Sequence, residues 1–298
     1  MEHRTLRSVC WYAILVFAFA MYGCGGPDPM TADRYEQADY LFSVLEKNVA
    51  ASEELEKIVS IDHSRLGADA GSVMPPAQVL IFSNPKLESQ LVSINPLTAI
   101  ELPLRVLAYE SVADRSGRVT FNSFEYIRSR YGLEDLHGLE ALFDTTMAGV
   151  LQGIDPGQIS VFEDNTMQPD GIVTLDSPFD FDTTVERLIA AIDAQDDTVW
   201  FGKIDFQSRA KELGTDISPT LLLMFGAPAP GGKAMAEAPT LGLDAFCQKL
   251  LVWQDGAGAA RVSFNDLSAI AERQEVPKSI ALRIISYRLK STFRGALE

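Results

Sequence analysis

Residues 118–122 read Arg-Val-Thr-Phe-Asn, and residues 261–265 read Arg-Val-Ser-Phe-Asn. The offset between the two stretches is 143 positions (261 − 118), and the same offset superimposes many other residues without a gap. These identities include Ile61-Asp62 with Ile204-Asp205, Gly71 with Gly214, Pro76 with Pro219, Phe82 with Phe225, Pro85 with Pro228, and Ile127 with Ile270. About fourteen identities between residues 61 and 127 compare with roughly four expected by chance. A period this long indicates a duplicated domain, because the units of solenoid proteins span only about 20–50 residues.

The second copy shows the order of its secondary structure most clearly. Strands are predicted for residues 172–175, 198–204, 220–225, 246–253 and 259–264. A helix capped by Thr183 is predicted, and Glu186 three residues later completes a capping box. The continuous apolar run from Thr220 to Phe225 predicts a central buried strand. Consecutive strands joined by a hairpin, with helices at particular points, predict an α+β fold in two tandem copies, each an antiparallel sheet with helices on one face.

Four segments are predicted along the chain. A signal peptide occupies residues 1–23, the first repeat residues 24–154, a polar linker residues 155–170, and the second repeat residues 171–298. The opening strand of the first repeat would fall at residues 29–32, which show no strand pattern. This strand is therefore either missing or replaced by the tether. Because duplicated domains can pair as the two chains of a homodimer do, we expect the repeats to pack as a pseudo-symmetric pair.

The first repeat carries a series of short motifs. They are Ile61-Asp62-His63, Gly71, Pro76, the run from Val79 to Pro85, Pro96, Glu101-Leu102-Pro103-Leu104-Arg105 and Gly117-Arg118-Val119. With these motifs the chain resembles the domain of unknown function 302 family over nearly all of both copies. The resemblance implies a β-α-β₄-α sandwich resembling the TATA-binding-protein class. It implies no established activity, so it does not by itself name a function.

A carboxylate and an imidazole are neighbours at Asp62 and His63. Such a pair is able to act as a general base, a ligand or a pH sensor. The alternative is structural, with Asp62 capping the helix that follows and His63 packing in its first turn. In the second copy Asp205 keeps its place while Phe206 replaces the histidine, which favours the structural interpretation for Asp62.

Asn84 and Arg105 complete the candidate ligand site of the first repeat. Asparagine at a strand end is able to orient a ligand, and arginine binds a carboxylate or phosphate. The alternative treats Asn84 as a turn former and Arg105 as part of a surface ion pair, and the sequence favours this alternative. At the 143-residue offset the second copy has Ala227 and Gln248 instead, so any polar site is sought between Ile61 and Arg105.

The composition excludes several classes of function. The formal net charge is −16 and the sequence pI about 4.6. A phosphate-binding surface needs clustered Lys and Arg, so nucleic acid is not expected as a partner. The sequence contains no metal-ligand spacing, complete phosphate loop, dinucleotide fingerprint or nucleophile elbow, so we expect neither a metal nor a cofactor. It leaves open whether the protein is an enzyme.

The N-terminus carries an export signal. An apolar run at residues 9–22 follows a short positively charged stretch and precedes Gly23-Cys24-Gly25. A run this short is typical of a signal peptide, since a spanning helix needs about 20 residues. The surroundings of Cys24 resemble the lipobox of bacterial lipoproteins, which implies acylation of its thiol. Cleavage near Ala20 and a short uncleaved anchor are the alternatives.

The sequence therefore predicts a binding or structural module of the bacterial cell envelope. A lipid on Cys24 would attach it to the membrane, on the periplasmic face of the outer membrane, and its partner would be a protein or a small ligand. The alternative is a ligand-binding or catalytic site in the first repeat around His63. That site requires His63, Asn84 and Arg105 to line one concave pocket.

Overall fold

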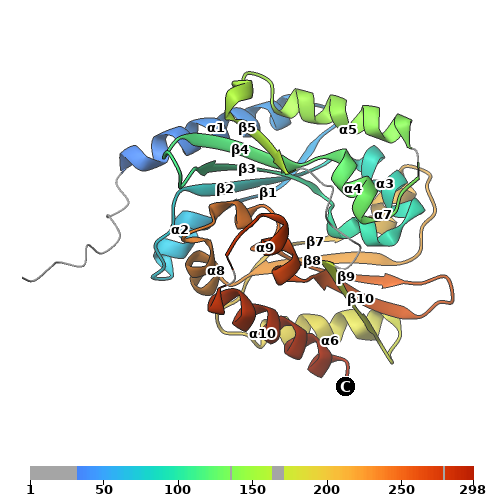
Figure 1. Ribbon diagram of the computed structural model, residues 1–298. Coiled ribbons are helices and arrows are strands. Elements are labelled where there is room, and N and C mark those ends of the chain that lie inside the picture. Colours follow the sequence, from blue (N-terminus) through green and yellow to red (C-terminus); the bar gives the residue numbers. More distant parts are fainter. Residues whose placement is uncertain (1–31, 135, 163–170, 278) are drawn as a thin grey trace, which may run out of the picture.

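Two five-stranded sheets, one in each repeat, form the centre of the molecule (Figure 1). The computed structural model describes residues 32–134, 136–162, 171–277 and 279–298. The predicted signal peptide and Cys24 lie outside these residues. The predicted α+β class is confirmed.

The first repeat follows the order α-β-α-β-α-β-β-α-α-β. Its elements are α1 (Ala32–Ala51), β1 (Glu56–Asp62), α2 (His63–Asp69), β2 (Ala77–Ser83), α3 (Pro85–Ile94), η1 (Pro96–Ile100), β3 (Leu104–Glu110), β4 (Gly117–Asn122), α4 (Phe124–Arg130), α5 (His137–Val150), η2 (Pro156–Gln158) and β5 (Ile159–Phe162).

The second repeat begins with a strand instead of a helix. Its elements are β6 (Ile172–Asp176), α6 (Phe181–Asp193), β7 (Val199–Asp205), α7 (Phe206–Glu212), β8 (Thr220–Gly226), α8 (Pro228–Met235), η4 (Pro239–Gly242), β9 (Gln248–Gln254), β10 (Ala260–Asn265), α9 (Leu267–Arg273) and α10 (Ile280–Ala296). The helix predicted to have Thr183 as its cap begins at Phe181 instead, because the Asp180 carboxylate caps it by accepting from the Thr183 N–H at 2.8 Å.

The internal repeat is visible in the bounds of the elements. β1, α2, β2, β4 and α4 recur as β7, α7, β8, β10 and α9, with both ends moved by 143 residues. β9 departs from this offset by one residue. Arg105 pairs with Ile81, while Met224, the counterpart of Ile81, pairs with Lys249. The structural counterpart of Arg105 is therefore Lys249, and the gap-free alignment with Gln248 is wrong by one position.

The edge of the first sheet is completed by a strand from the predicted linker. β5 pairs with β4 in parallel, with Val119 opposite Ile159. In the second sheet the same edge position beside β10 is occupied by the antiparallel strand β6. The first repeat thus takes its edge strand from the chain after α5.

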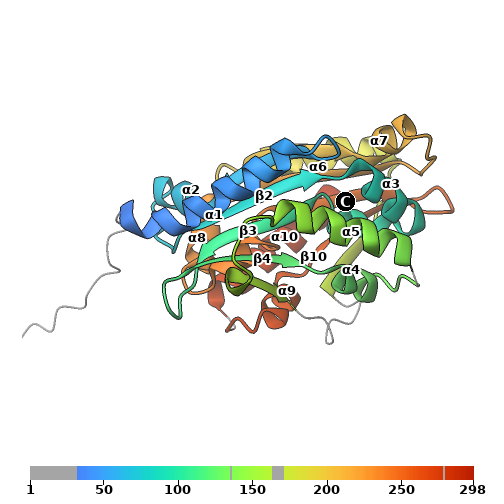
Figure 2. The ribbon, with the colours of Figure 1, turned by 90° about the horizontal axis from the view of Figure 1, so that it is seen from above.

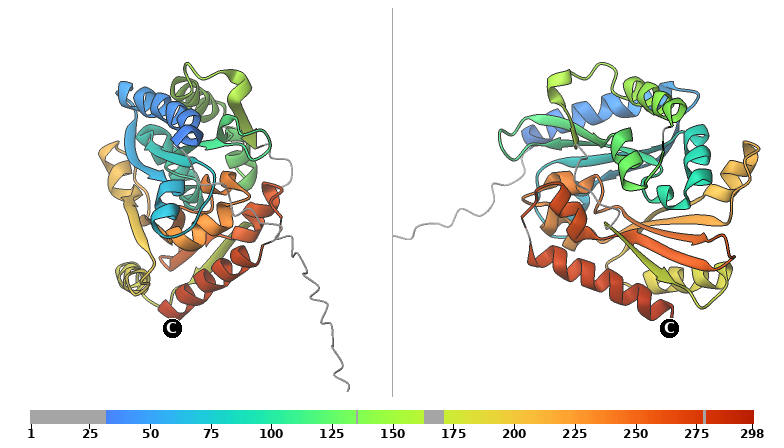
Figure 3. Two further views of the ribbon diagram at one scale, coloured as in Figure 1. Left: turned by 90° about the vertical axis from the view of Figure 1, so that its left-hand side faces the viewer. Right: turned by 45° about the vertical axis from the view of Figure 1, so that its right-hand side comes forward.

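The layers follow from the apolar faces of the sheets. α1 contacts β2, β3 and β4 and runs beside α5 over the outer face of the first sheet (Figure 2). α6 and α10 cover the outer face of the second sheet on the opposite side of the molecule (Figure 3). Between the sheets, η1 of the first repeat packs on β8, β9 and β10, and η4 of the second packs on β2 and β3. In the described part of the chain, no helix combines the length and the apolar character that crossing a membrane requires.

The repeats share their main hydrophobic core. Leu107 of the first repeat and Phe206 and Leu241 of the second belong to one continuous cluster of buried side chains. Burying each such side chain contributes about 1.5–3 kcal/mol. The expected packing of the two repeats against each other is present, and it is reciprocal: α2 crosses α8, and their counterparts α7 and α3 also cross.

Candidate functional site

Asp62 has the capping role that the structural interpretation gave it. Its Oδ1 accepts the N–H of Arg65 at 2.9 Å, and Asp205 caps α7 in the same way through Ser208. A carboxylate at this position satisfies an N–H of the first helical turn that would otherwise lack a partner.

His63 is buried at the contact between the repeats. Its Nε2–H donates to the main-chain oxygen of Gly242 in η4 at 3.0 Å. A Cβ on Gly242 would lie 2.8 Å from the His63 ring, so only glycine allows this approach. Burial lowers the pKa of His63 to about 4 despite this hydrogen bond, so the imidazole is neutral at pH 7.

Asn84 serves as the N-cap of α3. Its Oδ1 accepts the N–H of Leu87 at 3.2 Å, and its Nδ2 donates to the hydroxyl of Thr146 in α5 at 2.9 Å. The amide oxygen therefore caps α3, and the amide nitrogen links α3 to the outer helix α5. No described pocket brings Asn84, His63 and Arg105 together, and a ligand role for these residues stays a prediction.

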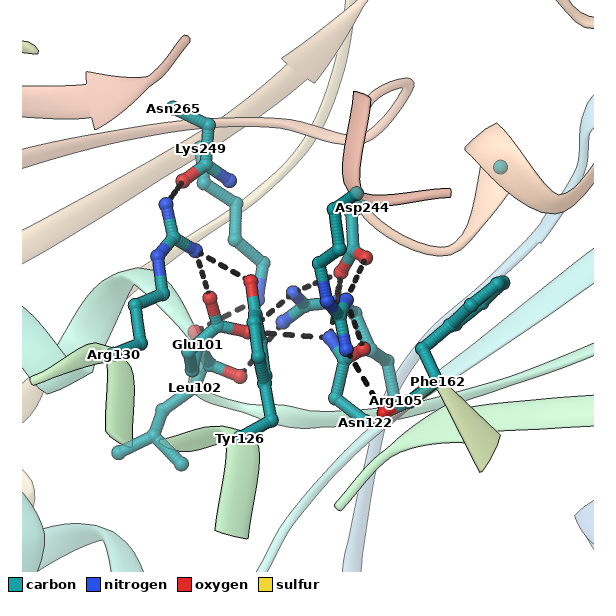
Figure 4. Close-up of polar contacts among 12 residues, drawn as sticks. Glu101, Leu102, Arg105, Asn122, Tyr126, Arg130, Phe162, Asp244, Lys249 and Asn265 are labelled. Atoms are coloured by element: carbon teal, nitrogen blue, oxygen red, sulfur yellow. Dashed lines mark hydrogen bonds and ion pairs between the residues drawn. The ribbon is translucent and has the colours of Figure 1, made fainter. Parts of the chain in front are cut away.

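Arg105 is buried between the two repeats, which differs from the surface ion pair that the sequence favoured. Its guanidinium donates to Glu101 of its own repeat (Nη2–Oε2, 2.7 Å) and to Asp244 of the other (Nε–Oδ1, 3.0 Å) (Figure 4). All three side chains are nearly inaccessible to solvent. Removing one partner would leave another charge buried without compensation, so these ion pairs resist separation of the repeats.

Lys249 reaches across the interface in the opposite direction. Its Nζ donates to the main-chain oxygen of Leu102 in the first repeat at 2.9 Å (Figure 4). Burial, together with the nearby charge of Arg105, lowers the pKa of Lys249 to about 7. Arg105 and Lys249 are structural counterparts, so each repeat extends one cation into the other.

A second pair of cations is exchanged across the interface. Arg130 in α4 donates to the amide oxygen of Asn265, and Arg273 in α9 donates to that of Asn122, both at 2.8 Å. Arg130 and Arg273 occupy equivalent positions in the two repeats, and so do Asn122 and Asn265. The two hydrogen bonds are therefore related by a pseudo-twofold axis, as in an isologous dimer.

The buried network leaves little room for a substrate. Burial acts to raise the pKa of the Glu101 carboxyl, but Arg105 and Arg130 outweigh it and hold this pKa well below its usual range. The void beside Glu101, Arg105 and Asn122 measures about 10 Å³, which is space for one water molecule. The arrangement fits a structural interface better than a catalytic centre.

A larger pocket lies in the second repeat. It has a volume of about 100 Å³, lies between β8, α8, α6 and α10, and is open to solvent on one side. The apolar side chains that line it include Ile192, Phe225, Pro230, Phe246, Ile285 and Phe293. A closed apolar cavity of about 150 Å³ binds benzene. This pocket is smaller, but because it is open on one side we compare it with a single aromatic ring or a short alkyl chain that extends to the rim.

Side chains fill the same space in the first repeat. Leu87 occupies the position of Pro230, and Glu88 occupies that of Gly231; both are buried. Glu88 accepts from the Ser83 hydroxyl at 2.6 Å, and burial raises its pKa to about 7. The larger side chains on α3 thus occupy the volume that the small residues of α8 leave open.

The rim of the pocket is polar but its charge is balanced. Arg288 donates to the amide oxygen of Gln195 and to the Asp197 carboxylate, each at 2.6 Å. An ion pair that is already satisfied gains little from a ligand charge. The pocket therefore suits an uncharged molecule whose polar group lies at the rim.

This pocket was not predicted, because the candidate residues taken from the sequence were polar. The available signal was the run of small residues from Ala227 to Gly232. In the structure this run forms most of α8, and a Cβ on Gly232 would lie 2.8 Å from the Cβ of Ser72 in the first repeat. Small residues therefore serve two purposes here: they allow close contact with the first repeat and they leave the pocket open.

Comparisons with known proteins give a consistent assignment. The profile of the family described as "Domain of unknown function DUF302" matches residues 39–153 and 173–288. The fluoride-specific ion channel FluC 1 of Brucella suis biovar 1 is 34% identical over 106 residues, which are 36% of this chain and 41% of that protein. FluC 1 of Brucella abortus biovar 1 shows the same identity over 38% of its length. The chain thus spans about two fifths of the length of these curated relatives.

One solved structure is similar to part of the chain. The crystal structure of the uncharacterized conserved protein DUF302 from Bacillus stearothermophilus is 19% identical, covers 43% of this chain and 96% of its own, and has a TM-score of 0.36. The two segments that match the family profile make up most of the chain. The protein belongs to the DUF302 family, as a tandem pair of its domains.

Proposed function

We propose that this protein is a binding module of the cell envelope whose second repeat binds a small uncharged apolar molecule. One observation carries the proposal: the apolar pocket of about 100 Å³ in the second repeat, at a place where the first repeat has the larger buried side chains of Leu87 and Glu88. Well-formed apolar pockets with a few polar groups at the rim are the usual sites of small ligands.

The difference between the repeats supports a ligand rather than a packing defect. Apolar side chains that line an open pocket lack the contacts that a filled core would give them. The first repeat shows that Leu87 and Glu88 are compatible with this fold, so the space in the second repeat is not required by the architecture. A bound molecule would compensate for the missing contacts.

The ligand class follows from the lining. Three aromatic rings, those of Phe225, Phe246 and Phe293, face the pocket, and two of them already pack edge to face at 6.1 Å. Aromatic rings favour this geometry with a further ring. A benzene-sized ring that carries a hydroxyl or carbonyl toward Gln195 fits both the wall and the rim.

Toluene is a suitable probe because it offers the ring alone. At ten times its Kd it should raise the melting temperature of the full chain by about 3 °C. Pro230→Leu introduces the leucine that the first repeat has at this position, so it should fill the pocket and abolish the shift. Lys233→Leu is the matched control, since Lys233 is exposed on the same helix and does not line the pocket.

The proposal fails if toluene produces no shift in the wild-type chain. It also fails if Pro230→Leu, correctly folded by circular dichroism, responds to toluene as the wild type does. A shift lost in Pro230→Leu and retained in Lys233→Leu supports the pocket.

The envelope location rests on the N-terminus. An apolar run followed by Cys24 in a setting of small residues supports export and a lipid anchor. Metabolic labelling in a bacterial host with an alkyne-tagged palmitate should label the wild-type chain and leave Cys24→Ser unlabelled. Equal labelling of the two, or none of the wild type, would refute the anchor.

A further inference from the structure

The outer face of α10 combines exposed apolar and basic side chains. Ile280 is 77% exposed, Ile284 61% and Tyr287 75%, and the three share one face of the helix with Arg283 and Arg294. Exposed single apolar residues are common, but a row of them along one helix indicates a surface that a membrane or another molecule covers. We call Ile280, Arg283, Ile284, Tyr287 and Arg294 the α10 face.

The α10 face carries a charge opposite to that of the molecule as a whole. The chain has a formal net charge of −16, whereas α10 contains Arg283, Arg288, Lys290 and Arg294 and no acidic residue. Arg288 and Lys290 form ion pairs with Asp197 and Asp266 at the flanks. Arg283 and Arg294 point outward, and within the described residues no ion pair engages either of them.

The first repeat supplies an internal reference. α5 is the counterpart of α10, and its buried residues Leu139, Phe143 and Val150 correspond to the buried Leu282, Ser286 and Phe293. Where α10 has Arg283 and Tyr287, α5 has Glu140 and Asp144. The shared fold therefore does not require an apolar basic surface, and the α10 face is a property of the second repeat alone.

We propose that the α10 face lies on the surface of a membrane that contains anionic lipids. Isoleucine and tyrosine side chains along a helix that lies in the interface insert between the headgroups, and neighbouring arginines attract anionic lipids. A second copy of the chain is a poorer occupant. Two α10 faces packed against each other would bring arginines of like charge together.

The position of the pocket agrees with this orientation. Ile284 belongs to the α10 face and also lines the pocket, so the pocket opens beside the surface that would face the lipid. The membrane proposal does not depend on the pocket. Its test therefore uses only Arg283, Tyr287 and Arg294, which do not line the pocket.

The test places a tryptophan on the α10 face. Tyr287→Trp in the full chain is mixed with vesicles of phosphatidylglycerol and brominated phosphatidylcholine, and the emission of the wild-type chain is subtracted. Quenching by the bromine atoms is expected for Trp at 287 and not for Trp at 144 in the matched control Asp144→Trp. This comparison reports which face touches the lipid, even if the N-terminus itself tethers the chain.

The role of the arginines on the α10 face is tested in the Tyr287→Trp variant. Adding Arg283→Gln and Arg294→Gln should weaken the binding of this face to anionic vesicles about 30-fold, the effect of two arginines near such a surface. Three outcomes would overturn the proposal. They are no quenching at position 287, equal quenching at 144, or an emission shift at 287 that depends on protein concentration without lipid and so reports a second copy.

Discussion

The imidazole of His63 illustrates how burial decides the role of a single residue. It donates to the Gly242 carbonyl inside the contact between the repeats, where only 5% of its surface is exposed. Its partner Asp62 is committed to a helix cap. A histidine that is held neutral by burial, with its Nε2–H already used, is suited to packing rather than to proton transfer at neutral pH.

This environment predicts a specific pH dependence of stability. The pKa of His63 falls from 6.5 in the unfolded chain to about 4 in the folded one. The unfolded state therefore binds the extra proton as pH drops below 6.5, and stability is lost between pH 6.5 and 4. The neutral His63 contributes about 3 kcal/mol to the free energy of unfolding at high pH, and about 2 kcal/mol of this contribution is lost at pH 5.

His63→Phe, which copies Phe206 of the second repeat, removes this titration. Urea unfolding at pH 7 and pH 5 should show that the variant loses about 2 kcal/mol less stability over this interval than the wild type. An equal loss in both proteins would show that His63 is not buried in its neutral form.

The pairing of buried charges could not be predicted from the sequence. Glu101 and Arg105 were recognisable as a motif, but the partner Asp244 comes from the other repeat, 139 positions along the chain. No local pattern links residues so far apart, so Arg105 was expected at the surface. The cap Asp62 was predicted because capping is a local interaction, whereas Asn84, the N-cap of α3, had been interpreted as a turn former.

Among the secondary-structure elements, α3 and α8 show how the repeats diverged. α3 begins at the capping residue Asn84, which also bonds to Thr146 on α5. α8 (Pro228–Met235) follows Ala227, which provides no side-chain cap. Both helices contact their outer helices, but only the first is joined to its outer helix through its capping side chain, and the pocket lies beside the contact of the second.

Asn84→Ala should lower the free energy of unfolding by about 1–2 kcal/mol, since it removes a cap and leaves the buried Thr146 hydroxyl without its partner. A double-mutant cycle with Thr146→Ala isolates the second contribution, and we expect a coupling of about 0.5–1.5 kcal/mol in chemical denaturation. If Asn84→Ala is as stable as the wild type, then α3 is not held in this way.

Elements with a strong local pattern were predicted well, and those defined by their neighbours were not. β8 was recognised as a buried strand because its run is continuously apolar. β5 lies in a polar segment, and it is a strand because β4 offers a free edge for pairing. The one-residue shift of β9 could not be seen either, since β10 returns to the original offset.

At the scale of the whole molecule, the two repeats form one folding unit. Their main core is continuous, and buried cations cross the interface in both directions. Separating the repeats would expose this core and leave several charges without partners. Independent unfolding of either half is therefore strongly disfavoured.

The tryptophans allow this cooperativity to be measured. Trp200 and Trp253 lie in the second repeat, and Trp11 lies in the predicted signal peptide. Tryptophan fluorescence thus reports the second repeat, whereas far-ultraviolet circular dichroism reports both. The two signals should give the same midpoint in urea, and midpoints that differ would indicate repeats that unfold separately.

We propose that, after the duplication, the first repeat kept larger side chains at Leu87 and Glu88 while the second acquired a ligand-binding pocket at the equivalent place. The most direct measurement is the anomalous diffraction of crystals soaked in bromobenzene, which locates the bromine atom without prior assumption. We expect a peak among Phe225, Ile285 and Phe293 in the second repeat, and none at the equivalent position near Leu87. A peak in the first repeat, or none in the pocket of the second, would contradict this account.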